Sequence, residues 1–148
     1  MQKIMIQNRL KAVFVLVFSL FSFYSFAVEF DRAAVSVDNI KLDVEYAHTF
    51  EQRATGLMYR ESLCANCGML FKYTKPRKAS MWMKNTYIPL DVAFIDKQGK
   101  ITDIRAMQPH DLTSIGSSTD VLYALEMNLG WFAKHNIKVG QSVEIQIP

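Results

Sequence analysis

The sequence contains few of the residues that bind metals. It has only two cysteines and three histidines, and the histidines (His48, His110 and His135) are scattered without the spacing of a zinc finger. A structural zinc site takes four ligands, so the two cysteines would need two further ligands that this spacing does not supply. The sequence therefore does not favour a structural zinc site, and we expect no cofactor.

A strong charge imbalance is also missing once the first 27 residues are set aside. Those residues hold three of the 17 Lys and Arg residues and none of the 14 acids, so 14 residues of each sign remain. A near-neutral chain offers no general electrostatic attraction for nucleic acid or for an anionic membrane. We therefore expect no nucleic-acid partner.

The first 27 residues have the pattern of a secretory signal. A basic front precedes an apolar run over residues 12–23, which is short for a membrane span, and small residues lead up to Ala27. We predict cleavage after Ala27, which leaves residues 28–148 as a single domain in the periplasm or outside the cell. The alternative is a retained amino-terminal anchor, and membrane contact would then involve only this segment.

The two cysteines lie close together, at Cys64 and Cys67. An oxidising compartment permits a disulfide between them, and this spacing suits a small bridged turn. A thioredoxin-like redox role would need the first cysteine at the start of a helix that follows a strand. Gly68 and an apolar strand-like segment follow instead, so a structural bridge is favoured over redox catalysis.

Long amphipathic helices are absent, whereas short apolar or alternating segments recur. We predict one strand over residues 35–47, a short helix capped by Thr49 and Gln52, and a second short helix that Asn128 caps. Further strands are expected at residues 68–73, 90–96, 100–107, 121–127 and 143–147. The pattern predicts a mainly β fold, a compact barrel or sandwich of short, largely antiparallel strands with one or two short helices.

Polar side chains gather in the stretch from Met81 to Asp91. Its first residues alternate in the period of a strand, and Pro89 then favours a turn or bulge. Lys84, Asn85 and Thr86 at such a bend could form a binding pocket, or they could satisfy the backbone of an irregular connection. Glu126 is a separate signal, because an acid on an apolar strand face is expected to pair with a cation or to lie near a pocket.

Four motifs resemble the family called domain of unknown function 192. They are Gly56–Arg60, Gly68–Phe71, Trp82–Asp91, and Leu125–Glu126 with Gly130. The resemblance covers residues 35–147 and implies a compact, mainly β domain that is frequently exported in bacteria, without implying an activity. Carried onto this sequence, the polar motif positions give the candidate ligand-binding residues Arg60, Lys84, Asn85, Thr86, Asp91 and Glu126.

These residues favour an exported binding or accessory domain for a small polar ligand or a protein partner. One alternative is cuprous-ion binding through the methionines Met58, Met69, Met81, Met83, Met107 and Met127. A second alternative is a hydrolase in which Asp91 and Glu126 form an acid pair. No Gly-x-Ser-x-Gly motif is present, and we favour binding over catalysis. A purely structural role for the polar residues is the third alternative.

Overall fold

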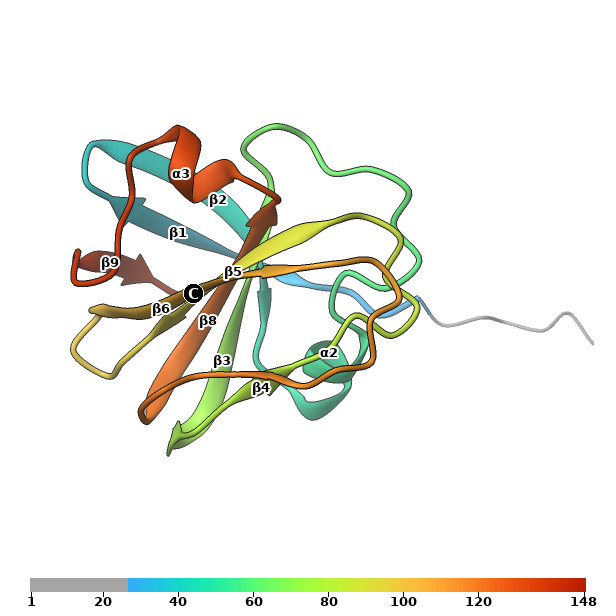
Figure 1. Cartoon of the computed structure of the whole chain (residues 1–148). Helices are drawn as coiled ribbons and strands as arrows, with labels where there is room; N and C mark the ends of the chain where they lie inside the picture. Colours follow the sequence, from blue (N-terminus) through green and yellow to red (C-terminus); the bar gives the residue numbers. More distant parts are fainter. Residues whose placement is uncertain (1–26) are drawn as a thin grey trace, which may run out of the picture.

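The computed structural model describes residues 27–148, which form a curled seven-stranded sheet and a two-stranded ribbon (Figure 1). The large sheet has the order β6-β5-β8-β3-β2-β1-β9, and β4 pairs with β7 in the ribbon. The strands are β1 (Asp31–Val37), β2 (Ile40–Ala47), β3 (Gly68–Arg77), β4 (Ser80–Met81), β5 (Leu90–Ile95), β6 (Ile101–Met107), β7 (Ile115–Gly116), β8 (Val121–Asn128) and β9 (Val143–Gln146). The two helices are α2 (Phe50–Thr55) and α3 (Trp131–Lys134).

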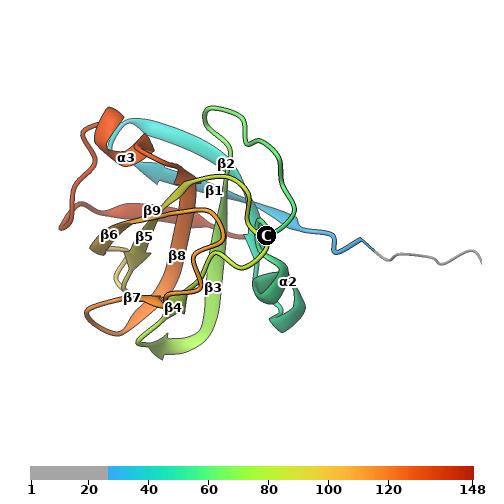
Figure 2. The same cartoon turned by 45° about the vertical axis from the view of Figure 1, so that its right-hand side comes forward.

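The sheet curls so far that its two ends meet. The amide of Ile101, at the start of β6, donates to the carbonyl of Gln141 just before β9 (3.0 Å), and the amide of Val143 donates to Gly99 (2.7 Å). These bonds join the first and last strands in the sheet order, and the views in Figures 1 and 2 show β6 and β9 near each other. The predicted mainly β class is confirmed, with a curled, barrel-like sheet.

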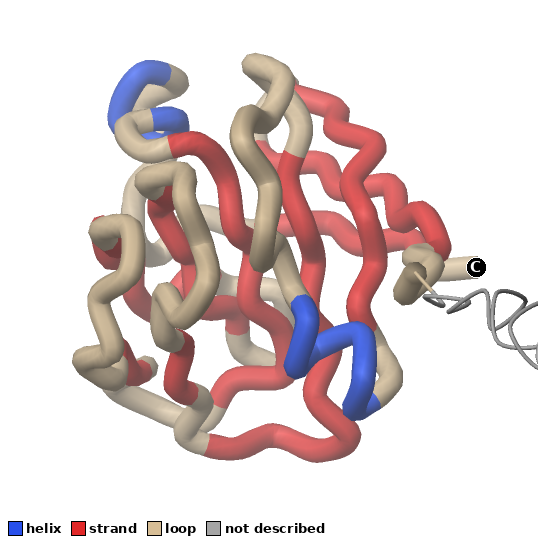
Figure 3. Tube along the Cα trace, turned by 90° about the vertical axis from the view of Figure 1, so that its right-hand side faces the viewer, coloured by secondary structure: helices blue, strands red, loops and turns tan. Residues whose placement is uncertain are grey.

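Neighbouring strands of the large sheet are antiparallel except for β2 and β3. A parallel pair needs a crossover connection, and here the connection contains α2. Figure 3 shows α2 at the lower end of the sheet, away from α3. The crossover therefore brings the helix and the residues after it onto one face of β3 and β8.

The large sheet packs against a separate hydrophobic core on each of its two faces. The first core fills the inside of the curled sheet, where Leu70, Leu125 and Met127 pack with Trp131 and Phe132 of α3. The second core lies on the opposite face of the central strands and is covered by the segments around α2, β4 and β7. Its buried residues include Met69, Phe71, Val92, Phe94, Leu57, Met83 and Ile88. Alternate residues of β8 thus face different cores, as expected for a strand.

The capping box predicted at Thr49 is confirmed. The Gln52 amide donates to Thr49 Oγ1 (3.1 Å), and the Gln52 side chain accepts from the Thr49 amide (3.0 Å). A further bond from Gln52 Nε2 to the carbonyl of Glu29 (2.9 Å) ties the helix start to the beginning of the described chain. The short α2 is therefore fixed at its amino-terminal end by side-chain contacts.

Three predicted boundaries are wrong. The strand expected over residues 35–47 is two strands, because Asp38 takes a left-handed φ of 54° and the chain turns between β1 and β2. The strand that starts at Gly68 does not stop at residue 73 but continues to Arg77 along the exposed end of the sheet. The second helix starts after Gly130, whose φ is 81°, rather than at an Asn128 cap.

The predicted Cys64–Cys67 disulfide is present. Its turn is held against β8 and α3, because Asn128 Nδ2 donates to the Cys64 carbonyl (2.9 Å) and Trp131 Nε1 donates to Asn66 Oδ1 (3.1 Å). This anchoring agrees with a structural bridge.

The predicted secretory signal occupies residues that lie, except for Ala27, outside the described part of the chain. Within residues 27–148, neither helix has the length and apolar character required to span a membrane.

Candidate functional site

A cavity of about 90 Å³ lies between the carboxyl-terminal turn of α2, the start of β4 and the faces of β3 and β8. We call it the Glu126 cavity. Its lining residues are Arg53, Ala54, Thr55, Gly56, Leu57, Met58, Phe71, Ser80, Met81, Trp82, Thr86 and Glu126. Segments far apart in sequence therefore build one concave site.

Glu126 reaches this cavity because of its place in the middle of the sheet. On β8 it pairs with Met69 of β3 on one side and with Val92 of β5 on the other. Residues paired across neighbouring strands point to the same face, and both partners belong to the second hydrophobic core. The carboxyl group is thus held among apolar neighbours, on the face that α2 covers.

The Glu126 carboxyl has no protein partner in the part of the chain that the structure describes. The residue is only 4% exposed, and neither a hydrogen bond nor an ion pair to its side chain is formed there. Its oxygens are nevertheless not sealed in, because the described residues include no side-chain polar atom that is both closed off and unbonded. The carboxyl therefore opens into the cavity.

Burial raises the pKa of Glu126 from its ordinary value of 4.5 to about 8. The cause is loss of hydration, since an apolar environment disfavours the charged form. Tyr73 on β3 lies close by, and burial, with the charge of Glu126 adding to it, raises the pKa of Tyr73 to about 12. At neutral pH both groups carry their protons. Strongly shifted acids in a cavity are a recognised property of functional sites.

The cation on the cavity wall, Arg53, is engaged elsewhere. Its Nη1 donates to the carbonyl oxygens of His48 and Lys72, the latter at 3.1 Å. Burial alone accounts for the raised pKa of Glu126, with no contribution from the guanidinium. Arg53 therefore holds α2 to the neighbouring strands and does not neutralise the acid.

Of the six predicted site residues, two line the cavity. Glu126 forms its base, and Thr86, which is 5% exposed, contributes to the wall. Thr86 Oγ1 donates to the carbonyl of Lys84 (3.2 Å), so its hydroxyl proton is used in holding the bend. Of the two alternatives predicted for Glu126, pairing with a cation or lying near a pocket, the structure shows the second.

Three more of the predicted residues do not line the cavity and make contacts elsewhere. Arg60 Nη2 pairs with the Glu45 carboxylate (2.6 Å). Asn85 has a left-handed φ of 53°, and its Nδ2 donates to the hydroxyl of Tyr59 (2.8 Å). The ammonium of Lys84 lies 5.3 Å from the centre of the Trp82 ring. These residues do not converge on the cavity, and their predicted binding roles stay predictions.

The predicted acid pair of Asp91 and Glu126 does not form. Asp91 pairs across the sheet with Met127, while Glu126 pairs with Val92, so the two acids point to opposite faces. Asp91 Oδ2 accepts a hydrogen bond from the amide of Gly130 (2.8 Å). Burial raises the pKa of Asp91 above its ordinary value, although this hydrogen bond opposes the shift. Asp91 therefore fixes the start of α3, and the hydrolase alternative loses its geometric basis.

The six methionines considered for cuprous-ion binding do not gather at one point. Met69, Met83 and Met107 are core residues on the outer face, and Met127 lies in the other core. Only Met58 and Met81 line the cavity, and Met81 Sδ accepts a hydrogen bond from the Tyr73 hydroxyl (3.4 Å). Within the described range, residues 27–148, no cluster of three or more His, Cys, Asp or Glu side chains is placed to hold a metal ion.

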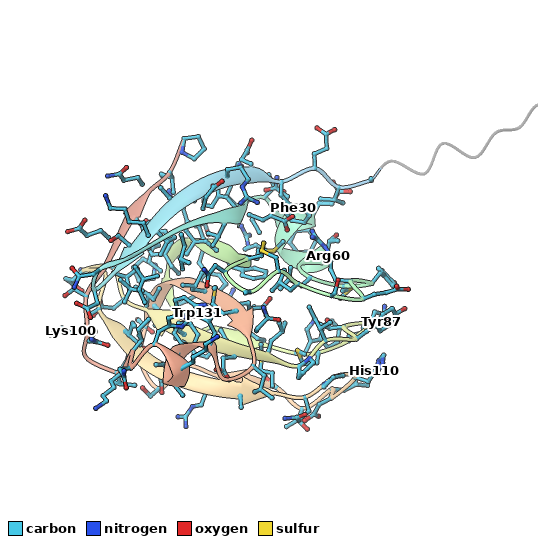
Figure 4. The ribbon with its side chains drawn as sticks, turned by 90° about the horizontal axis from the view of Figure 1, so that it is seen from above. Phe30, Arg60, Tyr87, Lys100, His110 and Trp131 are labelled. Carbon is cyan, nitrogen blue, oxygen red and sulfur yellow. A yellow bond between two sulfur atoms is a disulfide. The ribbon has the colours of Figure 1, made fainter. Side chains whose placement is uncertain are left out.

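An exposed aromatic cluster adjoins the cavity. The Tyr87 ring contacts the rings of Tyr59 (6.2 Å between centroids) and His110 (5.3 Å), and Figure 4 shows Tyr87 and His110 on neighbouring loops at one end of the molecule. Tyr59 and His110 have left-handed φ values of 64° and 62°, a conformation that is unusual for residues other than glycine. Tyr59 follows cavity residue Met58, and Tyr87 follows cavity residue Thr86, so two members of the cluster are next to cavity residues along the chain.

The chain is similar to one protein family and to solved structures. The family model DUF192, described as "Uncharacterized ACR", matches residues 33–145. No curated protein matches the chain.

Two solved structures are similar over nearly their whole length. One, from Sinorhizobium meliloti 1021, is provisionally named a transcription regulator; it is 36% identical, with a TM-score of 0.74, over 80% of this chain and 96% of that chain. The other is a protein of unknown function from Novosphingobium aromaticivorans DSM 12444, 31% identical with a TM-score of 0.71, over 82% of this chain and 89% of that chain.

Proposed function

This chain belongs to the DUF192 family, and from the geometry of the Glu126 cavity we propose that it is a binding domain for a small polar ligand. The carrying observation is the Glu126 carboxyl, which is buried, opens into the cavity and has no partner in the described chain. Removing a polar group from water without a compensating hydrogen bond costs about 1–3 kcal/mol or more. A ligand that bonds to the carboxyl would offset this cost.

The size of the cavity sets the size of the group that enters it. A cavity of about 150 Å³ holds benzene, which has six carbon atoms. By that scale, a cavity of about 90 Å³ takes a group of about four non-hydrogen atoms. A larger ligand would insert one end and rest its remainder on the exposed aromatic cluster beside Met58 and Thr86.

Binding is favoured over hydrolysis by the placement of the acids. Glycoside hydrolysis commonly uses two carboxyl groups that flank one bond, and here the register turns Asp91 away from Glu126. A single protonated carboxyl can bind a ligand by donating a hydrogen bond to it, and this needs no second acid. The charge of this chain gives no support to the provisional name of the Sinorhizobium relative, because residues 28–148 carry equal numbers of basic and acidic side chains.

We further propose that the domain acts outside the cytoplasm, after removal of residues 1–27. The pattern of those residues supports this, and the Cys64–Cys67 bridge is compatible with an oxidising compartment. Mass spectrometry of the protein from a periplasmic extract should give a chain that starts at Val28. A chain that retains residues 1–27 in the cytoplasmic fraction would contradict this location.

Amide chemical-shift mapping tests the ligand site. The probes are four molecules of similar size, namely propan-1-ol, propionamide, sodium propionate and propylammonium chloride. At least one should shift the amides of Gly56, Leu57 and Thr86 in a saturable way, because these residues line the cavity. If none of the four shifts these amides, the proposed site is wrong.

A matched pair of substitutions supplies the control. Ser80 is an exposed residue on the cavity wall, and Ser142 is an exposed residue beside the other end of the sheet. Ser80→Phe should place a ring across the cavity mouth and abolish the saturable shift, whereas Ser142→Phe should leave it unchanged. Equal effects of the two substitutions would argue against binding at this cavity.

A further inference from the structure

The Glu126 cavity offers hydrogen-bond acceptors to a ligand. The carboxyl of Glu126 is unpaired in the described chain, and the carbonyls of Ala54 and Gly56, at the end of α2, receive no backbone hydrogen bond. The last carbonyls of a helix commonly lack intrahelical partners and carry its negative end. The Thr86 hydroxyl donates to the backbone, and Arg53 Nη1 is engaged by two carbonyls.

The remaining walls also suit a cation. Phe71 and Trp82 line the cavity with aromatic rings, and the Trp82 ring already attracts a cation, the ammonium of Lys84 at 5.3 Å. The thioethers of Met58 and Met81 are polarizable and apolar. The carboxyl group, the ring faces and the thioethers together line a site in which no cation of the described chain is bonded to Glu126.

We infer that the Glu126 cavity takes the primary ammonium group of an organic amine, with the Glu126 carboxylate as its counter-ion. This inference rests on the proposed ligand-binding function and specifies the class of ligand. An ammonium group has three donors and no acceptor, which complements the Glu126 carboxylate and the carbonyls of Ala54 and Gly56. A short alkyl chain of about three carbons fits the scale of the cavity.

The titratable groups around Glu126 leave this role to Glu126 alone. On β3, Tyr73 stays neutral because its pKa is raised to about 12. On α2, Arg53 is bonded to backbone carbonyls, and on the segment after β4 the ammonium of Lys84 lies over Trp82. Arg77 acts on Tyr73 and not on Glu126. From β5, the residue facing Glu126 is the apolar Val92.

Binding of an ammonium group should release a proton. Below pH 8 the free carboxyl is mostly protonated, because burial raises its pKa to about 8. When the ammonium enters, Glu126 ionises, its proton passes to solvent, and the bound pair is neutral. The affinity should therefore rise about tenfold per pH unit below this pKa and then level off. An alkylammonium keeps its own proton across this range, with a pKa of about 10.

The experiment titrates the protein with propylammonium chloride and follows the ¹³C shift of the Glu126 side-chain carboxyl by NMR. We expect a saturable shift, a lowered pKa of Glu126 and a stronger affinity at higher pH. Glu126→Gln should weaken propylammonium binding at least about tenfold, the value of one lost charge-assisted contact. Glu61→Gln, at an exposed position, should have no such effect. Sodium chloride at equal ionic strength controls for screening.

Propan-1-ol and propionamide separate the two levels of the proposal. If either neutral probe binds as tightly as propylammonium and the pKa of Glu126 does not fall, the ammonium class is overturned while the ligand site stands. If none of the four probes shifts the amides of Gly56 and Leu57, both the site and the class are overturned. Propylammonium binding that is equally strong in Glu126→Gln also overturns the assignment.

Discussion

Replacing Glu126 with glutamine should change how the stability of the protein depends on pH. Burial raises the pKa of Glu126 from 4.5 to about 8. Between these values the folded state holds a proton that the unfolded state has released, so the free energy of unfolding falls as pH rises. The favourable contribution is complete below the unfolded pKa, and it is lost as pH rises through the folded pKa. Glutamine has nearly the same shape and does not titrate, so the variant should lack this loss.

The size of the effect follows from the two pKa values. One pKa unit corresponds to about 1.4 kcal/mol. Between about pH 5 and pH 8, the unfolded carboxyl is mostly ionised throughout and the folded carboxyl ionises only at the end, so the loss is about 3 to 4 kcal/mol. This is a large share of the roughly 5–15 kcal/mol that stabilises a typical domain. Near pH 8, Glu126→Gln should therefore be more stable than the unchanged protein.

Urea unfolding at these two pH values measures the effect directly. The difference between pH values, compared between the protein and Glu126→Gln, cancels the contributions of the other titrating groups. Glu61→Gln, where the carboxyl is exposed, should behave like the unchanged protein. If the protein and Glu126→Gln lose the same free energy between the two pH values, Glu126 is not a buried, unpaired acid and the reasoning fails.

Substitutions at three further positions test the other polar residues. Arg60→Ala should lower the free energy of unfolding by about 1 kcal/mol, because it removes the half-buried ion pair with Glu45; urea unfolding measures this, and probe binding in the cavity should not change. Asp91→Leu should cost about 1–3 kcal/mol, because the Gly130 amide loses its acceptor, whereas Asp91→Asn keeps a carbonyl oxygen there and should cost less. Calorimetry that finds Asp91→Asn the less stable of the two would contradict that role. Asn85→Gly should be about 1 kcal/mol more stable than Asn85→Ala, because the backbone there is left-handed; equal melting temperatures would refute this.

The mainly β class could be predicted because it depends on local patterns. The alternation in the strands, the hairpin between residues 90 and 107 and the capping box at Thr49 each involve neighbours in sequence, and each is present in the structure. The turn at Asp38 was missed because alternation continues through it, so only the backbone of Asp38 reveals that one predicted strand is two.

The candidate site could be predicted only in part, because it depends on long-range pairing. Glu126 gave a local signal, as a single acid on an apolar strand face, and this signal identified the base of the cavity. The sequence could not show that Asp91 faces the other way, since this follows from the register between β5 and β8. Nor could it show that the crossover from β2 to β3 brings the end of α2, with Arg53 and Gly56, over Glu126.

The polar bend before Pro89 illustrates the same limit. Of its residues, Thr86 uses its hydroxyl locally and lines the cavity, while Asn85 holds Tyr59 and Lys84 covers Trp82. The two roles left open by the sequence, ligand pocket and support of an irregular backbone, are thus divided among neighbouring side chains. The position of each side chain relative to β8 distinguishes the two roles.

The pKa of the Glu126 carboxyl in the ligand-free protein tests the central claim most directly. A ¹³C NMR titration of the side-chain carboxyl should give a midpoint of about 8, because the group is desolvated without a counter-charge. A midpoint near the ordinary value of 4.5 would mean that water or a partner already stabilises the carboxylate. The cavity would then lack the unsatisfied acid on which both proposals depend.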